Sequence, residues 1–269
     1  MALCKDPISK ELANRGYNLV KLPRVGIAPL DVLGRQGDSL EKLGSIAEVW
    51  TSSVTLPTVG MPAPAAGIEG ERSSDLDVGI GLKLLANALA GLGGGISLPS
   101  LNAAYKRAKK VQFKFVNVES CSITPFAIGK FLANGTLDMS NPFTGQYFGN
   151  DETQEYIIFD VLKSDAISVT AKSEHGTVVE ADIGALNGAL SANVKTSAGS
   201  AASTDITFQG SVKATFAFKA FEVIFEDGKW AVRGVGADGG LDFALEEDDA
   251  YAADRGIVIA PGRMLKLKF

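Results

Sequence analysis

The stretch "DITFQGSVKATFAFKA", residues 205–220, alternates between apolar and polar side chains for almost its whole length. Alternation with a period of two is typical of a β-strand with one buried face, but strands of globular proteins usually have about 5–6 residues. The apolar positions of the stretch are Ile206, Phe208, Val212, Ala214, Phe216 and Phe218. A strand of this length needs an explanation beyond ordinary sheet packing.

A second alternating segment covers residues 75–85, and residues 177–195 alternate in their first half. In residues 75–85 the apolar positions are Leu76, Val78, Ile80, Leu82 and Leu84. With residues 103–118 and 205–220 these segments form two candidate hairpins, 75–85 with 103–118 and 177–195 with 205–220. Each candidate hairpin has a middle rich in small residues.

Two parts of these hairpins also have helical character. Residues 84–92 and 183–195 can be drawn as weak amphipathic helices, with Leu186 and Leu190 four positions apart. The sequence therefore leaves helix and strand open for both parts.

Turn chemistry predicts two pairs of strands and one short helix. Residues 155–173 split at Lys163, Ser164 and Asp165 into two strands that would form a hairpin, and residues 221–235 form two strands around Asp227 and Gly228. A short helix is expected before Asn134 and Gly135, a dipeptide that favours a tight turn.

Composition restricts the class of protein. The 269 residues are 46% hydrophobic, which is enough for a core, and the formal net charge of −5 argues against a general affinity for nucleic acid. The basic run at residues 106–110 is either a solvated face or a contact for anionic lipid or phosphate. No secretory signal is visible, and two distant cysteines are no disulfide framework, so we expect a reducing, cytoplasmic location.

Residues 84–105 carry no charge and are long enough for a membrane-spanning helix, but the glycine run Gly93, Gly94 and Gly95 and the proline Pro99 argue against one. A membrane-crossing β-strand needs about 9–11 residues with one apolar face, in a barrel that leaves no edge unpaired. In such a barrel the six apolar residues of 205–220 would face lipid, whereas in a resting protein the three phenylalanines of this stretch would contact protein. Four such segments cannot close a wide barrel, so a pore would require oligomers. The alternative is a long strand of a soluble sheet.

Catalytic chemistry has weak support. The single histidine, His175, lies in a polar stretch that predicts a surface turn, and Cys121 is expected to be a buried thiol. Residues 234–239 match GxGxxG with Asp254 downstream, but too little chain follows for a dinucleotide-binding sheet. The acidic residues 241–254 lack the spacing of a calcium loop, so a solvated linker is the simpler interpretation.

The opening "MALCKDPISKELANRGYNLVKLPR", the two hairpin-like segments and the short tail together resemble the bacterial gasdermins over essentially the whole chain. The resemblance implies an α+β fold, with a twisted central antiparallel β-sheet and peripheral helices in the soluble autoinhibited state. It also implies that the β-hairpins refold into an oligomeric membrane β-barrel. The predicted domains are a pore-forming domain (1–240), an acidic protease-sensitive linker (241–255) and an inhibitory peptide (256–269).

The implied function is that of an autoinhibited pore-forming protein and not of an enzyme. A caspase-like or other protease removes the C-terminal peptide, and the monomer then assembles into homo-oligomers that insert in membrane lipid and kill the cell in antiphage defence. The protein is expected in the cytoplasm before cleavage and in the cell inner membrane afterwards. The alternative function is that of a soluble β-rich structural or binding protein without membrane activity.

The resemblance also assigns site residues. Cys4 corresponds to the S-palmitoylated cysteine of the family, and Ala2 excludes the glycine that myristoylation requires. No cofactor, metal or nucleic acid is expected apart from the covalent palmitoyl group. Cleavage is expected between Leu241 and Gly256, with Leu245 and Arg255 as candidates. The tail residues expected to cover an apolar surface are Ile257, Val258, Ile259, Leu265, Leu267 and Phe269.

Overall fold

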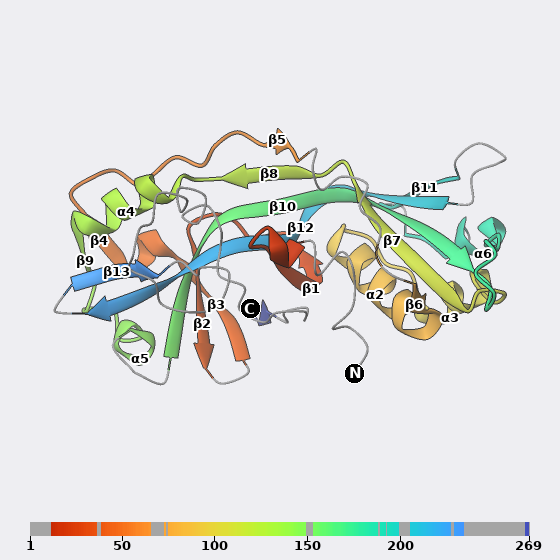
Figure 1. The fold of residues 1–269 in the computed structure, drawn as a ribbon, viewed down its shortest axis with the longest axis horizontal. Helices are drawn as coiled ribbons and strands as arrows, with labels where there is room; N and C mark the ends of the chain where they lie inside the picture. Colours follow the sequence, from red (N-terminus) through yellow and green to blue (C-terminus); the bar gives the residue numbers. More distant parts are fainter. Residues whose placement is uncertain are drawn as a thin grey trace.

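A computed structural model describes residues 12–36, 39–65, 73, 75–148, 153–187, 189–191, 193–198, 205–226, 229–233 and 267–268. These residues form one twisted 12-stranded sheet with helices at its sides, and a separate two-stranded sheet. Two strands run through the whole elongated molecule, β10 (Thr153–Lys172) and β12 (Asp205–Glu226), and they pair antiparallel (Figure 1).

One end of the molecule, which we call the body, contains the first part of β10 and the last part of β12. Here β2 pairs with β10, β3 pairs with β2, and β1 and β13 pair with β12. The elements of the body are β1 (Asn18–Arg24), β2 (Asp31–Gln36), β3 (Ser39–Ser45), η2 (Ile46–Glu48), β4 (Trp50–Ser52), β5 (Ala63–Pro64), β8 (Glu119–Ser122), α4 (Pro125–Ala133), β9 (Gly135–Leu137), α5 (Thr144–Tyr147), β13 (Lys229–Arg233) and β14 (Leu267–Lys268).

The opposite end, which we call the helical end, contains the last part of β10 and the first part of β12. Its strands carry helices along one side (Figure 1). The elements of the helical end are β6 (Leu76–Asp77), α2 (Val78–Gly91), α3 (Leu98–Ala104), β7 (Lys110–Val116), α6 (Ile183–Asn187) and β11 (Lys195–Ala198).

The length of β10 follows from its neighbours. β12 accompanies it on one side, while β2, β8 and β7 follow one another along its other side. Each neighbour pairs with a different part of β10, so the strand joins the body to the helical end. The length that the alternation predicted for β12 is confirmed.

The prediction of two strands within residues 155–173 is wrong, because β10 is continuous there. Ser164 explains the difference: its Oγ lies 2.5 Å from the Val116 carbonyl oxygen and 2.7 Å from that of Ala166, and it accepts from the Ala166 N–H at 3.1 Å. The pairing with β12 shifts register at this point. The turn-forming residues therefore make a bulge inside one strand and not a hairpin.

The prediction of a strand over residues 75–85 is wrong in this state. The strand ends at Asp77, whose side chain accepts from the Gly79 N–H and caps helix α2. From Val78 onward the helix buries Leu82, Leu85 and Leu89, which share a helical spacing, against the sheet. Tertiary packing thus decides between the two periodicities that the sequence contains.

Other predictions hold. Helix α4 ends at Ala133 with Asn134 as its C-cap, and β12 and β13 pair antiparallel from Glu226 and Lys229. The predicted fold class, a twisted antiparallel sheet with peripheral helices, is confirmed. Residues 177–195 contain α6 and only the first residue of β11, so their helical character prevails.

Candidate functional site

The strands of the helical end form a sheet with one apolar and one polar face, which we call the two-faced sheet (β7, the last part of β10, β11 and the first part of β12). Register aligns apolar residues across β7, β10 and β12. The first apolar row is Phe115, Ile167 and Phe208, and the second is Phe113, Val169 and Ile206. Because side chains alternate along a strand, both rows lie on one face.

Polar residues fill the rows between. One polar row is Lys114, Ser168, Thr207 and Ser197, and the next is Gln112, Thr170 and Asp205. Within the second row the Thr170 hydroxyl donates to Asp205 Oδ1 at 2.5 Å. The two faces of this sheet therefore differ in polarity over at least three strands.

The apolar face is covered by α2, α3 and α6, which we call the helical cover. Their side chains share one hydrophobic cluster with Ile167, Val169, Ile206 and Phe208. The residues of the cover with the least exposure are Leu82, Leu85, Leu89, Leu101 and Leu186. The cover thus replaces solvent on the face that would otherwise expose a broad apolar surface.

The cover approaches β12 closely at its end. A Cβ at Gly210 would overlap the backbone carbonyl oxygen of Leu92, the C-cap of α2. Glycine is therefore required at position 210 for the observed contact between this helix and the strand.

The tail contributes one short strand to the body. In β14, Leu267 lies opposite Leu40 of β3 in a parallel pair, and the strand also contacts β1. Leu267 is 3% exposed and shares a cluster with Leu33, Tyr156 and Phe218. The tail strand therefore ends the sheet path beside β3 and also contacts β1, the strand at the other end of that path.

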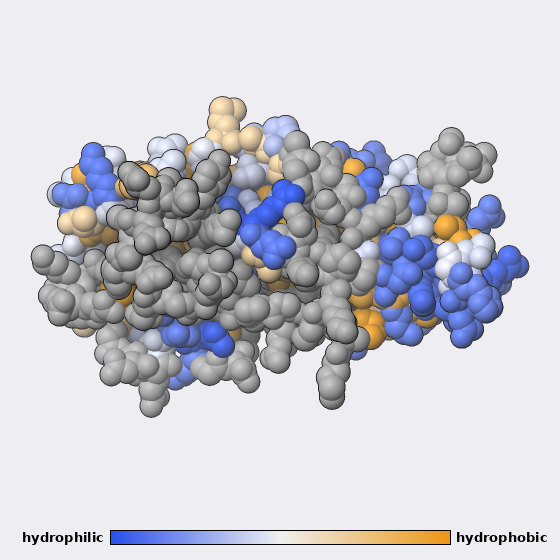
Figure 2. Space-filling view, in the orientation of Figure 1, coloured by the Kyte–Doolittle hydropathy of each residue, from blue (hydrophilic) through white to orange (hydrophobic). Residues whose placement is uncertain are grey.

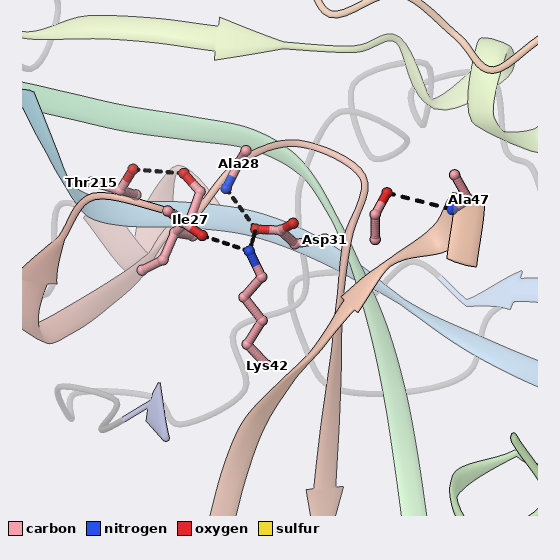
Figure 3. A network of polar contacts seen from close by, with 8 residues as sticks. Ile27, Ala28, Asp31, Lys42, Ala47 and Thr215 are labelled. Carbon is pink, nitrogen blue, oxygen red and sulfur yellow. Dashed lines mark hydrogen bonds and ion pairs between the residues drawn. The ribbon is translucent and has the colours of Figure 1, made fainter. Parts of the chain in front are cut away.

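A polar network ties the same region together (Figure 3). Lys42 Nζ forms an ion pair with Asp31 Oδ2 at 2.8 Å and donates to the Gly26 carbonyl at 2.6 Å, while the Ala28 N–H donates to Asp31 at 2.8 Å. The Thr215 hydroxyl donates to the Ile27 carbonyl at 2.9 Å. Burial raises the pKa of Asp31, and the contact with Lys42 opposes that rise. The loop between β1 and β2 is thereby fixed to β3 and β12.

Sequence reasoning missed a second buried polar cluster, at the centre of β10. Asp160 accepts from the Tyr17 hydroxyl at 2.5 Å and from the Ser120 hydroxyl at 2.7 Å, and Lys219 lies opposite it in register. Lys219 Nζ stands 4.8 Å from the centre of the Tyr17 ring. A charged residue at a central position of each long strand was the available signal, since such residues are rarely buried unless they are paired.

The six apolar residues predicted to face lipid are placed differently from one another. Phe208, Phe216 and Phe218 are fully buried, Ile206 and Ala214 are buried, and Val212 is 37% exposed. Phe216 stacks on Phe115 with ring centres 3.9 Å apart. In this state the aromatic residues thus contact protein, as expected for a resting protein, while a role against lipid stays a prediction.

A thiol and imidazole pair is excluded by position. Cys121 is buried in β8 opposite Val161, whereas His175 is exposed in a turn beyond Lys172. From Val161 to Lys172 the strand extends about 36 Å, at about 3.3 Å per residue. The two side chains therefore cannot act together in this fold.

Several predicted residues lie outside the described part of the chain. They are Cys4, the cleavage candidates Leu245 and Arg255, the tail residues Ile257, Val258, Ile259, Leu265 and Phe269, and the glycine motif at 234–239. Of the tail, only Leu267 and Lys268 are described. Their predicted roles stay predictions.

Within the described ranges no group of three or more histidine, cysteine or carboxylate side chains is placed to hold a metal ion. The helices of these ranges are also too short or too polar to cross a bilayer. What the arrangement offers chemically is a sheet with one apolar and one polar face, whose apolar face is covered by helices.

Comparison with known proteins identifies the family of the chain. The family model described as "Bacterial Gasdermin Family" matches residues 20–231. A gasdermin of Vitiosangium sp. is 35% identical over 231 residues, which are 85% of each chain, and one of Lysobacter enzymogenes is 32% identical over 251 residues, which are 92% of this chain and 91% of that one. The solved structure of a bacterial gasdermin from Bradyrhizobium tropiciagri has a TM-score of 0.62 at 18% identity and covers 85% of this chain and 90% of its own.

These matches define the class first: the protein is a pore-forming cell-death protein. More particularly, the chain belongs to the bacterial gasdermin family. Members of that family form pores and are not enzymes, which agrees with the weak support for catalysis in the sequence.

Proposed function

We propose that this protein is an autoinhibited pore former that a protease activates. A cut between Leu241 and Gly256 releases the C-terminal peptide, and the remainder assembles into a homo-oligomer. Each subunit inserts two hairpins, and together they close a large β-barrel in the cell inner membrane. The resulting leak kills the infected cell as an antiphage defence.

The observation that carries the proposal is the two-faced sheet beneath its helical cover. A membrane barrel wall needs one face for lipid and one for water, with every backbone group paired to a neighbouring strand. The rows that begin with Phe113 and Phe115 set the apolar side of such a wall, and those that begin with Gln112 and Lys114 set its polar side. The inserted hairpins would continue both sides into the bilayer. The helical cover occupies the side that lipid would contact.

The tail strand supports autoinhibition. Leu267 fills a position between β3 and β1, so its removal would expose an apolar site and a strand edge together. Burial of one leucine side chain contributes about 1.5–3 kcal/mol. A stabilisation of this size is small enough for the peptide to dissociate after a single cut.

The lipid attachment and partners complete the proposal. Palmitoylation of Cys4 would place one acyl chain near the start of the chain, which gives marginal membrane affinity and assists insertion without replacing it. The resting form is a cytoplasmic monomer, and its partners are a caspase-like or other protease, membrane lipid and further copies of the chain. Intact mass of protein from its native host would reveal the palmitoyl thioester.

Dye release from liposomes tests the pore. A protease site inserted between residues 241 and 256 should make leakage depend on cleavage. Val212→Asp changes an exposed residue of the apolar set, so the uncut protein should fold while leakage after cleavage falls about tenfold or more, because a charge on the lipid face is costly. Ser211→Asp is the matched control, an exposed neighbour of opposite parity, and should leak normally.

Equal leakage with and without cleavage would contradict the proposal. No leakage under any condition would favour the alternative, a soluble β-rich protein without membrane activity. Phe216→Asp is unsuitable for this test because Phe216 is buried and stacked on Phe115. A charge there would disrupt the resting fold before any pore could form.

A second test concerns the tail. Leu267→Ala leaves a cavity between β3 and β1, so the uncut protein should leak at lower concentration than the parent protein. Leu267→Met, which conserves volume, should behave like the parent. Identical leakage of all three uncut proteins would show that the tail strand does not restrain the pore.

A further inference from the structure

The helical end contains a short β-ladder between β6 and β7, although the chain continues from β6 directly into a helix. Leu76 of β6 pairs with Val111 of β7, and Asp77 pairs with Lys110, in antiparallel register. After these two pairs the chain turns into α2 and returns through α3 to β7. The ladder therefore closes a long loop that consists mostly of helix.

We infer that this ladder is the preformed base of the first membrane hairpin, and that its register fixes both the turn of the hairpin and the residues that contact anionic lipid headgroups. The inference rests on the proposed pore function. Continued residue by residue from the pair of Asp77 and Lys110, the register brings Leu92 opposite Gly95. Gly93 and Gly94 then form a two-residue turn.

That turn agrees with two independent facts. Gly-Gly is a preferred sequence for two-residue hairpin turns, which require positive φ angles. Gly93 already has φ of +81° in the resting structure. The register was extended from the two pairs of the ladder alone. The position of the turn at the glycine pair therefore supports this register.

The same register separates the two faces of the hairpin. Every second residue of the first strand, beginning at Leu76 and ending at Leu92, is apolar. These residues are Leu76, Val78, Ile80, Leu82, Leu84, Ala86, Ala88, Ala90 and Leu92. Opposite them on the second strand, Ser97, Pro99, Leu101, Ala103 and Tyr105 share the face that would contact lipid.

Charge marks where that face leaves the bilayer. Counting from the turn, Arg107 is the first charged residue on the lipid face of the second strand, and Lys109 is the next. The stretch from Gly95 to Tyr105 has 11 residues, and about 9–11 residues cross the hydrocarbon. The boundary of the hydrocarbon therefore falls between Tyr105 and Arg107.

Tyr105 fits this boundary better than it fits the resting fold. Its side chain is buried, and its hydroxyl has no hydrogen-bond partner among the described residues. An unpaired buried hydroxyl is unfavourable, whereas tyrosine is enriched where bilayer and water meet. Movement into the hairpin would give this hydroxyl a wet environment.

Arg107 and Lys109 are exposed in the resting structure, between α3 and β7. Figure 2 shows hydrophilic residues over much of the surface at this end of the molecule, with hydrophobic residues beside them. On the lipid face, just beyond Tyr105, both cations would lie at the depth of the phospholipid headgroups. Their charge selects anionic headgroups over zwitterionic ones.

Disulfide trapping tests the register. Asn87→Cys with Ser100→Cys joins residues that are opposite each other when Gly93 and Gly94 form the turn. Asn87→Cys with Asn102→Cys joins residues opposite each other when the turn moves by one, to Gly94 and Gly95. In cleaved, liposome-bound protein the first pair should form a disulfide at least fivefold more efficiently than the second, as measured by peptide mass spectrometry.

A second pair in the predicted register, Ala90→Cys with Ser97→Cys, lies at exposed positions and provides an independent trial if the first variant folds poorly. Leakage with preferential linkage of the Asn102 variant, or with linkage of neither register, overturns the inference and leaves the pore function intact. Absence of leakage from the parent protein after cleavage overturns the proposed function and the inference with it.

Charge substitution tests the headgroup contact. Arg107→Gln with Lys109→Gln removes two cations from the lipid face, and Lys106→Gln with Lys110→Gln removes two from the opposite face of the same run. Each basic residue near an anionic surface contributes roughly fivefold to binding, so the first variant should bind vesicles of phosphatidylcholine with phosphatidylglycerol about 10- to 30-fold more weakly after cleavage. The variant with Lys106→Gln and Lys110→Gln should lose several-fold less affinity for the same vesicles.

Vesicles of phosphatidylcholine alone complete this test. The difference between the two double variants should be absent there, because the headgroups carry no net charge. Equal losses in both variants on anionic vesicles, or the same difference on both kinds of vesicle, would overturn the assignment of Arg107 and Lys109 to anionic headgroups.

Discussion

The body and the helical end share the same two strands, β10 and β12, yet they pack them differently. In the body, all residues of β12 from position 214 to 221 are buried, so both faces of the strand contact protein. At the helical end, Ile206 and Phe208 are buried while Thr207 and Gln209 are not. One strand therefore serves as the centre of a core in one place and as a two-faced surface in the other.

This difference indicates which half can change without loss of the fold. The body encloses β12 between three hydrophobic clusters, whereas the helical end relies on one cluster beneath the helical cover. Removal of the cover would leave the backbone pairing of β7, β10 and β12 in place. Local opening is expected at the helical end, because there the strand β12 is covered on one face only.

The largest expected effect comes from truncating one fully buried phenylalanine in each half. Phe218→Ala in the body should lower the free energy of unfolding of the whole molecule by about 3–5 kcal/mol. Phe208→Ala opens an equally buried site at the helical end, so its cost should fall mainly on the cover. Thermal unfolding and amide hydrogen exchange measure the two contributions.

For Phe208→Ala we expect faster exchange in α2, α3 and β7, with the amides of β2 and the body part of β10 unchanged. For Phe218→Ala we expect faster exchange throughout. Equal acceleration everywhere in both variants would show that the molecule opens as one unit, and the distinction between the halves would fail.

A smaller effect is expected from a methyl group at the contact between cover and strand. Gly210→Ala would force its Cβ against the Leu92 carbonyl, so the end of α2 must move, at a cost of about 1–3 kcal/mol. The loss of protection against amide hydrogen exchange should be confined to α2. Dye release after cleavage should accelerate. Gly95→Ala is the control, since its Cβ would meet no atom within 4 Å. Unchanged exchange in α2 of the Gly210 variant would contradict this contact.

The sequence predicted the two faces of β12 better than it predicted its neighbours. Alternation at Ile206 and Phe208 is a local property, so it can be recognised without the fold. Residues 75–85 contain both a strand and a helix period, and only the packing of Leu82 and Leu85 on the sheet decides between them. Likewise Ser164 has the chemistry of a turn, and a bulge results because β7, β8 and β12 hold β10 extended on both sides.

In the candidate site, too, some features follow from local sequence and others from contacts between distant segments. Its apolar residues were predictable from alternation, whereas the pair of Leu76 with Val111 and the position of Leu267 beside Leu40 depend on contacts between distant segments. A strand of two residues has too short a sequence pattern to predict the strand with which it pairs. The register of β6 with β7 therefore had to come from the structure.

The smallest expected effect concerns a carboxylate of the body. Burial raises the pKa of Glu155, Glu222 adds to the rise and Thr153 opposes it, while Glu155 Oε1 has no hydrogen-bond partner among the described residues. The charged form is thus disfavoured in the fold, and its cost is present at neutral pH and disappears as pH falls through the folded pKa. Glu155→Gln should accordingly raise Tm at pH 7–8 by about 2–4 °C, or about 1 kcal/mol for a chain of this size.

That gain should shrink on acidification and vanish below the ordinary range of glutamate, near pH 4. Glu180→Gln, an exposed change at the helical end, should leave Tm unchanged at every pH. A gain for Glu155→Gln that stays constant between pH 4 and pH 8 would mean that the buried charge is not its cause. Since Glu155 lies in β10 between β2 and β12, a pH-dependent gain would locate the electrostatic cost in the body, where both faces of the long strands are enclosed.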